Sequence, residues 1–305
     1  MVENKSLGMK IFRVVNTLLM LLMGAICFLP MWHVLMASIS DPILLQQNHS
    51  LLLWPLGPAT EKGYLLVSMN PNILSSYANT LFYVVVGTLL SAFGTLTIGY
   101  VLSRRSFRYR NVLMVMITIT MLFKAGMVPL FLVVKSLKLL DTRWAVLLPS
   151  LLSVFNITIM RTAIEQLPES LMESAKIDGA GDVTILTRIV FPLVKTTFAV
   201  IVLFYAVSKW NEWFNAMLFL QNRKLFPLQL VLREILIINS DANAAGAEVA
   251  GGLDNYKELT KYATIIVATV PILCIYPFAQ KYFVSGVMIG AAQKGRDDRH
   301  GGDFG

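Results

Sequence analysis

The sequence predicts an all-α membrane protein with six transmembrane helices, and three observations lead to this prediction. Of the 305 residues, 56% are hydrophobic and only 14% are charged, whereas a soluble domain carries roughly 25% charged residues. The mean hydropathy is +0.64. The apolar residues form runs close to the length of about 20 residues that a membrane-spanning helix requires. We therefore expect residues 1–305 to form a single transmembrane domain in contact with lipid.

The first expected span covers residues 14–38. Basic residues precede it, as they precede the apolar region of a secretory signal peptide, but such a region is only about 7–15 residues long. Here the uncharged stretch runs from Val14 to Ser40. We therefore expect this segment to be a membrane-spanning helix.

Five further apolar runs predict the other spans. They are expected at residues 75–103, 110–134, 143–162, 194–218 and 262–284. The fourth span of the six is the shortest, because only its residues 144–160 are free of charge. An even number of spans places both ends of the chain on the same side of the membrane.

Basic residues in the connections predict which side that is, because Lys and Arg are enriched in short cytoplasmic loops. The connection between the second and third spans reads "SRRSFRYR" (residues 103–110) and contains no acidic residue. The segments that flank the first and last spans are basic as well. Both ends, and residues 163–193 between the fourth and fifth spans, are therefore expected in the cytoplasm. The net charge of +8 is assigned to this orientation, and no nucleic-acid partner is expected.

Small residues recur at every fourth position of the second span, at Gly87, Ser91, Thr95 and Gly99. Such a row lets another helix approach closely. The approaching helix belongs either to the same subunit, which we favour, or to a second subunit.

Residues 163–193 are too polar for a span and too regular for a plain loop. Pro168 and Glu169 suit the first turn of a helix, because proline is tolerated there and the helix dipole favours an acid. Gly179 is expected to end that helix. Asp182 is expected to cap a second short helix, which Pro192 would end. The expected apolar face of the first helix consists of Leu167, Leu171 and Ala175, and the polar side chains that point away from it are Glu169, Glu173 and Lys176. The segment thus forms an elbow suited to binding by a cytoplasmic partner.

The fifth span ends in the stretch "KWNEWFNA", residues 209–216. Lys209 and Glu212 are three residues apart and can pair on one face of a helix. Aromatic rings beside amides and a carboxylate suit a sugar, which has apolar faces and a rim of hydroxyl groups. An aromatic belt at the membrane interface with a structural ion pair is the alternative. The candidates for a substrate path are Trp210, Asn211, Glu212, Trp213 and Asn215.

No catalytic or nucleotide-binding motif occurs in the sequence. The patterns G-x-x-x-x-G-K-[ST], H-E-x-x-H and G-x-S-x-G are all missing, and His33, His49 and His300 are too far apart in sequence to suggest a metal site. We therefore expect no enzymatic activity, no cofactor and no metal in this chain. If ATP drives its function, another subunit hydrolyses it.

The stretch "ESAKIDGAGDVTILTRIVFP", residues 173–192, resembles the EAA loop of importer-type ABC permeases. That loop reads E-A-A-x-x-x-G, nine residues, then I-x-L-P, and the match rests on Glu173, Ala175, Gly179, Ile189 and Pro192. The stretches "KWNEWFNA" and "QKYFVSGVMIGAAQKG" are similar to the carbohydrate-uptake branch, in its maltose-permease-like second subunit. "LTKYATIIVATVPILCIYPF" resembles permeases for complex oligosaccharides, including acidic ones such as alginate or pectin fragments.

The resemblance implies a permease subunit of an ATP-driven oligosaccharide importer in the bacterial inner membrane. Its implied partners are a second homologous permease subunit, two ATPase subunits that bind ATP and Mg, and an extracellular or periplasmic solute-binding protein. The residues implied to couple the permease to the ATPase are Glu173, Ser174, Ala175, Asp178, Gly179 and Pro192. The alternative is a channel or an ion-coupled secondary carrier that uses Lys209 and Glu212 as its coupling pair. Dependence on partner subunits distinguishes the two.

Overall fold

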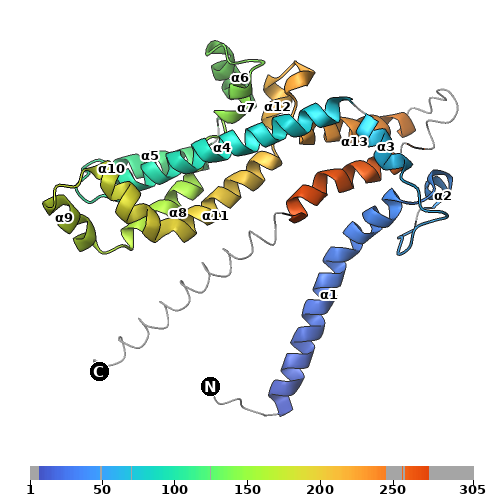
Figure 1. Cartoon of the computed structure of the whole chain (residues 1–305), viewed down its shortest axis with the longest axis horizontal. Coiled ribbons are helices and arrows are strands. Elements are labelled where there is room, and N and C mark those ends of the chain that lie inside the picture. Colours follow the sequence, from blue (N-terminus) through green and yellow to red (C-terminus); the bar gives the residue numbers. More distant parts are fainter. Residues whose placement is uncertain are drawn as a thin grey trace. The chain divides into compact units, whose positions relative to one another are not determined.

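The computed structural model describes residues 7–48, 50–69, 71–123, 125–244, 256 and 258–274, and all regular structure in these ranges is helical. The chain divides by its internal contacts into two units. Unit 1 comprises residues 1–71 and 232–270, and unit 2 comprises residues 72–231 and 271–305. Figure 1 labels the helices in both units.

Unit 1 contains the long N-terminal helix α1 (Leu7–Ser38), the short helices α2 (Pro42–Gln47) and α3 (Lys62–Met69), and residues 258–270 of a helix over residues 258–274. The end of α1 packs on α2 and on the helix 258–274 through a small apolar core that includes Met36, Leu45 and Leu259. No residue in the apolar window of α1 is buried among the described parts of the chain. Its side chains are therefore available to lipid or to another subunit.

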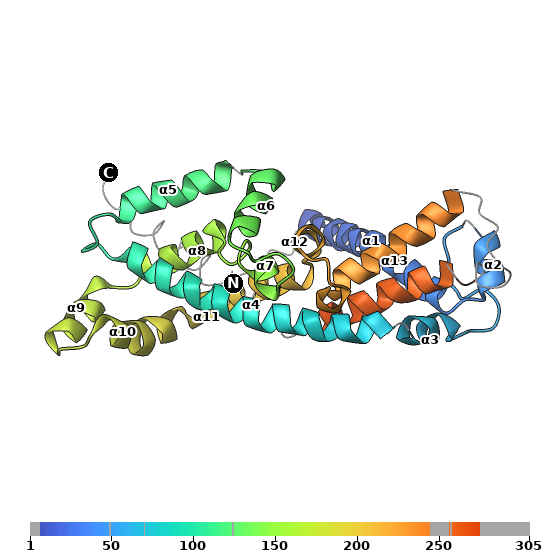
Figure 2. The same ribbon diagram turned by 90° about the horizontal axis from the view of Figure 1, so that it is seen from above.

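Unit 2 is built along the helix α4 (Pro71–Ser103). The helices that follow are α5 (Arg110–Leu122), α6 (Met127–Ser136), α7 (Arg143–Leu147), α8 (Val154–Glu165), α9 (Glu169–Ile177), α10 (Asp182–Thr184), the π-helical segment η1 (Ile185–Val190), α11 (Phe191–Trp210), α12 (Phe214–Phe219), the 3₁₀ turn η2 (Arg223–Leu225) and α13 (Leu228–Ala244), which continues into unit 1. In Figure 2, α9 and α10 lie at the end of unit 2 where α4 ends and α5 begins.

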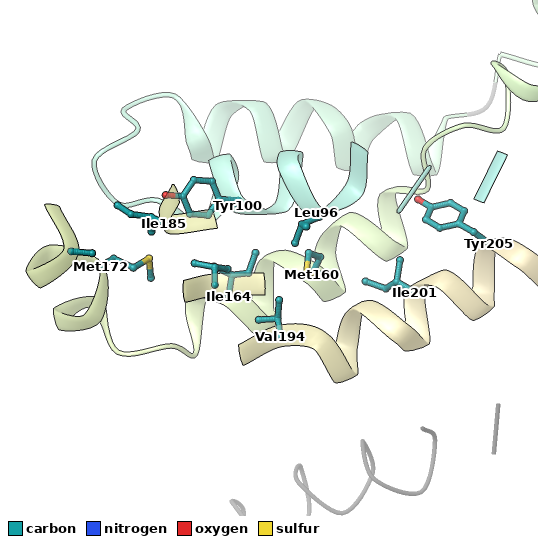
Figure 3. Packing of buried hydrophobic residues seen from close by; sticks show 11 residues of the cluster. Leu96, Tyr100, Met160, Ile164, Met172, Ile185, Val194, Ile201 and Tyr205 are labelled. Atoms are coloured by element: carbon teal, nitrogen blue, oxygen red, sulfur yellow. The ribbon is translucent and has the colours of Figure 1, made fainter. Parts of the chain in front are cut away.

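The core of unit 2 joins α4, α8 and α11 to the elbow. Leu96 and Tyr100 of α4 face Met160 and Ile164 of α8, and Met172 of α9 extends the same cluster (Figure 3). Further along α11, the Tyr205 hydroxyl lies 2.7 Å from the Thr95 hydroxyl and accepts a hydrogen bond from the Ser153 N–H at 3.0 Å. The elbow is thus packed onto the helices of unit 2.

Within the described residues, three helical stretches are long and apolar enough to cross a membrane: Gly8–Ser38, Asn72–Ser103 and Asp182–Trp210. The expected spans 14–38 and 75–103 fall within the first two. The expected span 262–284 begins inside the helix 258–274, and the rest of it lies outside the described residues.

The expected span over residues 110–134 is broken in the structure, because α5 and α6 are bent by 117° at a break between them. Pro129 lies in the first turn of α6, where its missing N–H is tolerated, whereas a helix running through from α5 would place its ring against the carbonyl one turn back. Gly126 takes φ +82° at the start of α6, a conformation that glycine adopts readily. The pair can be counted as one broken span.

The expected helix over 143–162 is likewise interrupted. α7 ends at Leu147, Pro149 lies in the irregular stretch that follows, and α8 begins after Ser153, whose hydroxyl accepts a hydrogen bond from the Asn156 N–H. The expected span 194–218 is interrupted as well, between α11 and α12.

The small residues of α4 pack against helices of the same chain, as we favoured. A Cβ at Gly87 would lie 2.8 Å from Leu147 Cδ2, and one at Gly99 would lie 2.8 Å from Met160 Cγ and 3.2 Å from the Arg161 backbone nitrogen. Ser91 is fully buried between these positions. The row therefore serves the close approach of α4 to α7 and α8.

Gly99→Ala is expected to destabilise the chain by about 1–3 kcal/mol, the usual cost of overpacking. The backbone of Arg161 cannot rotate away from the added methyl group as a side chain can. Thermal unfolding of the detergent-extracted chain measures this effect. Gly24→Ala is the matched control, because a Cβ at Gly24 meets no atom within 4 Å. Equal unfolding temperatures for the two variants would contradict the prediction.

Candidate coupling surface and substrate path

The elbow begins with α9, which ends at Ile177 with Asp178 as its C-cap, and Gly179 follows in the turn that stops the helix, as predicted. Gly179 has φ +82°, and its N–H donates to the Lys176 carbonyl at 3.0 Å while the Ala180 N–H donates to the Ala175 carbonyl at 2.9 Å. This pair of bonds is the Schellman motif, which ends a helix with a residue in the left-handed conformation. The turn after α9 is therefore fixed by hydrogen bonds that require the glycine conformation.

The faces of α9 are only partly as predicted. Met172 and Ala175 are buried in the core of unit 2, but Leu171 is 44% exposed. Leu167 lies before the helix begins, so it does not define a helical face together with Leu171. The buried face is set instead by the (i, i+3) pair Met172 and Ala175.

The predicted coupling residues divide into exposed and buried ones. Glu173, Ser174, Asp178, Gly179 and Pro192 are exposed, whereas Ala175 is buried. Ala175 thus anchors the elbow, and the others are accessible to a partner.

Two exposed apolar side chains of the elbow were missed by the sequence reasoning. Ile177 is 86% exposed and Val183 is 76% exposed. Ile177 follows Glu173 by four positions and Ser174 by three, so the three side chains share one face of α9. This spacing in the sequence could have predicted that Ile177 lies on the same exposed face as Glu173 and Ser174. The exposed face of the elbow is therefore mixed, with an apolar side chain among polar ones.

The second half of the elbow differs from the prediction. Gly181, not Asp182, occupies the N-cap position of α10. The Asp182 carboxylate accepts a hydrogen bond from the Tyr100 hydroxyl at 3.2 Å and lies 3.9 Å from Lys176 Nζ. Asp182 thus links the elbow to α4 and to α9.

The prediction that Pro192 ends a short helix is wrong. The helix continues without interruption from Asp182 to Trp210, and Pro192 is the second residue of α11, two positions after the π-helical segment η1 ends at Val190. A π-turn changes the hydrogen-bonding register of a helix and often occurs where the regular ladder is interrupted. The missing N–H of Pro192 falls at this change of register. The fifth span is therefore joined rigidly to the elbow.

The candidate substrate path lies at the opposite end of α11. The helix ends at Trp210, and α12 begins at Phe214. Glu212, in the break, accepts hydrogen bonds from the N–H of Asn215 at 3.0 Å and from its Nδ2 at 3.1 Å. The structure thus brings Glu212 and Asn215 together, and Glu212 binds the first turn of α12.

The predicted ion pair between Lys209 and Glu212 does not form. Lys209 is 2% exposed and its Nζ donates to the carbonyl and hydroxyl oxygens of Ser150 at 2.8 and 2.7 Å. The i, i+3 spacing pairs residues only within one helix, and the helix ends between these two. The prediction failed for that reason.

The other members of the candidate path differ in their exposure. Trp210 is 5% exposed, stacks edge-on against Tyr77, and has an indole N–H without a hydrogen-bond partner among the described residues. Trp213 is half-buried, and Asn211 is exposed. Aromatic and amide groups thus gather around a break in a membrane helix.

Apolar helices with a packed elbow at one end and a helix break at the other are compatible with a membrane-transport component. The chain belongs to the family of binding-protein-dependent transport system inner membrane components, whose family model matches residues 95–289. This confirms the resemblance to ABC importer permeases and the location in the inner membrane. The chain is the permease component of an ABC transport system, and ATP hydrolysis belongs to another subunit.

Several known proteins are similar to most of the chain. Protein LplC of Bacillus subtilis (strain 168) is 39% identical over 284 residues, which are 93% of this chain and 95% of that protein. The polygalacturonan/rhamnogalacturonan transport system permease protein YtcP of the same organism is 38% identical over 276 residues, which are 90% of this chain and 95% of that protein. A chain in the crystal structure of a bacterial ABC transporter involved in the import of the acidic polysaccharide alginate matches with a TM-score of 0.80 and 32% identity, covering 91% of this chain and 98% of that chain.

Proposed function

We propose that this chain is the permease subunit of an ATP-driven importer for oligosaccharides, and specifically for acidic ones. The observation that carries the proposal is the similarity over about nine-tenths of the chain to a permease for polygalacturonan and rhamnogalacturonan and to a component of an alginate importer. Polygalacturonan and alginate are both built from sugar acids. A shared preference for chains of uronic acids is the simplest common property of these relatives.

The proposed topology has six spans with both ends in the cytoplasm. It is supported by contacts between the elbow and the arginine-rich connection, residues 103–110. Arg105 forms an ion pair with Glu169 of α9 at 3.4 Å, and Arg104 contacts Met172. Because arginine-rich connections are retained in the cytoplasm, the elbow belongs on the cytoplasmic side as well.

The elbow is proposed to be the coupling element that binds an ATPase subunit. The exposed Glu173, Ser174, Ile177 and Asp178 would form the contact, and the bonds at Gly179 would hold it in position. ATP and Mg would be bound by two such ATPase subunits. Since the helix 182–210 is continuous with the elbow, a movement of the elbow is transmitted directly to the fifth span.

The break between α11 and α12 is proposed to contribute to the path of the oligosaccharide. Non-helical backbone at membrane depth is tolerated where it is enclosed by protein or lines an aqueous cavity. Trp210 and Trp213 would offer apolar ring surfaces, and Asn211, Glu212 and Asn215 would offer hydrogen-bonding groups. A second permease subunit would enclose the other side, and an extracellular or periplasmic binding protein would deliver the sugar.

The ion-coupled carrier is less well supported by the structure. Its coupling pair, Lys209 and Glu212, is divided between two separate hydrogen-bonded groups. No other observation favours an ion-coupled carrier over the importer.

The proposal predicts that the tagged chain extracted gently from its native membrane carries ATPase subunits and a second permease with it. ATPase activity of this complex, with its binding protein present, should rise severalfold with a galacturonate oligosaccharide. A neutral galactose oligosaccharide of equal length is the matched control. Equal stimulation by both would contradict the acidic specificity, and a chain that purifies alone without ATPase activity would contradict the importer.

A further inference from the structure

A cavity of about 350 Å³ lies in unit 2 between the elbow and the arginine-rich connection. It is bordered by the end of α4, the start of α5, the end of α8 and the start of α9. Its size falls within the range of roughly 300–1,000 Å³ that is typical of sites for small molecules. Three arginines line it, namely Arg104, Arg105 and Arg110, together with Glu165 and Glu169.

The carboxylates of the cavity are already paired. Glu169 binds Arg105 at 3.4 Å, and Glu165 binds Arg161 of its own helix at 3.0 Å. Arg104 and Arg110 form no ion pair within the described parts of the chain. Among the described residues, the cavity is therefore left with two positive charges that no carboxylate neutralises.

Arg104 points inward although its charge would be well hydrated outside. Its guanidinium lies 5.4 Å from the centre of the Tyr100 ring and contacts the sulfur of Met172. These contacts position the group at the cavity wall, and they leave its charge uncompensated. Arg110 is half-buried and begins α5. Tyr109, at the N-cap of this 13-residue helix, makes no side-chain hydrogen bond to the first turn, so the amides of that turn add positive potential beside Arg110.

We propose that this cavity binds a phosphate group, carried either by an anionic phospholipid or by free phosphate. The guanidinium group matches the oxygens of phosphate with two parallel hydrogen bonds, and two unpaired arginines suit a group of one to two negative charges. The cavity adjoins the end of the span Asn72–Ser103, which is the depth at which lipid headgroups lie. Basic pockets between membrane helices are known to accept such headgroups. The site is independent of the transported solute.

A phosphate group bound there would lie close to the elbow. Arg105 holds Glu169 at the first turn of α9, and Arg104 contacts Met172 in its buried face. A ligand bound by Arg104 would therefore be held by a side chain that already contacts α9. The site lies next to the elbow for that reason.

The test compares the intact chain with Arg104→Gln/Arg110→Gln and with Arg108→Gln. Arg108 lies in the same connection and is exposed, but it does not line the cavity, so its variant controls for the loss of charge alone. Native mass spectrometry of the chain in detergent, titrated with phosphatidylglycerol, measures the lipid arm. Thermal unfolding in phosphate against chloride at equal ionic strength measures the free-phosphate arm.

We expect the double variant to lose at least about tenfold in affinity in one of the two arms, as befits the loss of charge-assisted bonds, while Arg108→Gln resembles the unchanged chain. An effect in the lipid arm identifies a headgroup, and an effect in the other arm identifies free phosphate. If all three chains behave alike in both arms, the site does not exist. Arg110→Gln alone repeats the test if the double variant fails to fold, because the Arg110 side chain has no hydrogen bond or ion pair among the described residues to lose.

Discussion

Gly179→Val is expected to uncouple ATP hydrolysis from transport while the permease remains in the membrane at its normal level. Gly179 has φ +82°, and holding a non-glycine residue in such a conformation costs on the order of 1–3 kcal/mol. A Cβ at Gly179 meets no described atom within 4 Å, so the strain arises from the backbone conformation. Relief of this strain breaks the bonds to Lys176 and Ala175 and reorients α9. The prediction depends on the proposed role of the elbow.

Gly181→Val is the matched control for this experiment. Gly181 lies two residues further on, has φ −71°, and also has open space around the position of a Cβ. Sugar uptake and ATPase activity are measured on the complex in lipid vesicles. Uptake per ATP should fall roughly tenfold in Gly179→Val, since about 1.4 kcal/mol corresponds to a factor of ten, and should change little in Gly181→Val. Equal behaviour of the two variants, or loss of Gly179→Val from the membrane, would contradict the coupling role.

The features that the sequence predicted correctly depend on local rules. The stop of α9 before Gly179 follows from the conformational preference of a single residue, and Pro168, expected inside the first turn, lies one position earlier at the N-cap. The close packing of α4 could be predicted from the sequence, because Gly87 and Gly99 leave room for a neighbouring helix whichever helix that is. Family membership could be predicted from the EAA loop, because the residues from Glu173 to Pro192 match its characteristic spacing.

The features that were predicted wrongly depend on where helices break and on contacts between distant segments. Lys209 binds Ser150, which is 59 residues away in sequence, and no spacing rule predicts that partner. The faces of α9 were misassigned because Leu167 was counted as part of a helix that begins two residues later. The continuity of the helix through Pro192 depends on a π-helical segment, for which the sequence carries no clear signal.

Lys209→Glu is expected to remove most of the permease from the membrane. Lys209 is buried, and its Nζ lies 2.8 Å from the Ser150 carbonyl oxygen. A carboxylate at this position would face the Ser150 carbonyl oxygen, which cannot donate a hydrogen bond, and a buried charge without an opposite charge costs several kcal/mol. The substitution would also disturb the contact between α11 and the segment that joins α7 to α8. The amount of chain in isolated membranes, measured by immunoblotting, checks this prediction.

Lys209→Met is the informative comparison, because it keeps an unbranched side chain beside Gly87, where a Cβ would lie only 3.2 Å from Lys209 Cδ and Cε. It leaves the Ser150 carbonyl without its donor, at a cost of about 1–3 kcal/mol, but it also removes a charge that is costly to bury in a membrane helix. Since these effects oppose each other, we expect the methionine variant to reach the membrane at close to the normal level and to transport. If it reaches the membrane but does not transport, the charge of Lys209 acts on the solute or on a coupled ion, and the purely structural role assigned by its bonds to Ser150 is wrong. If both variants are lost from the membrane, the donor to Ser150 matters more for folding than the removal of the buried charge.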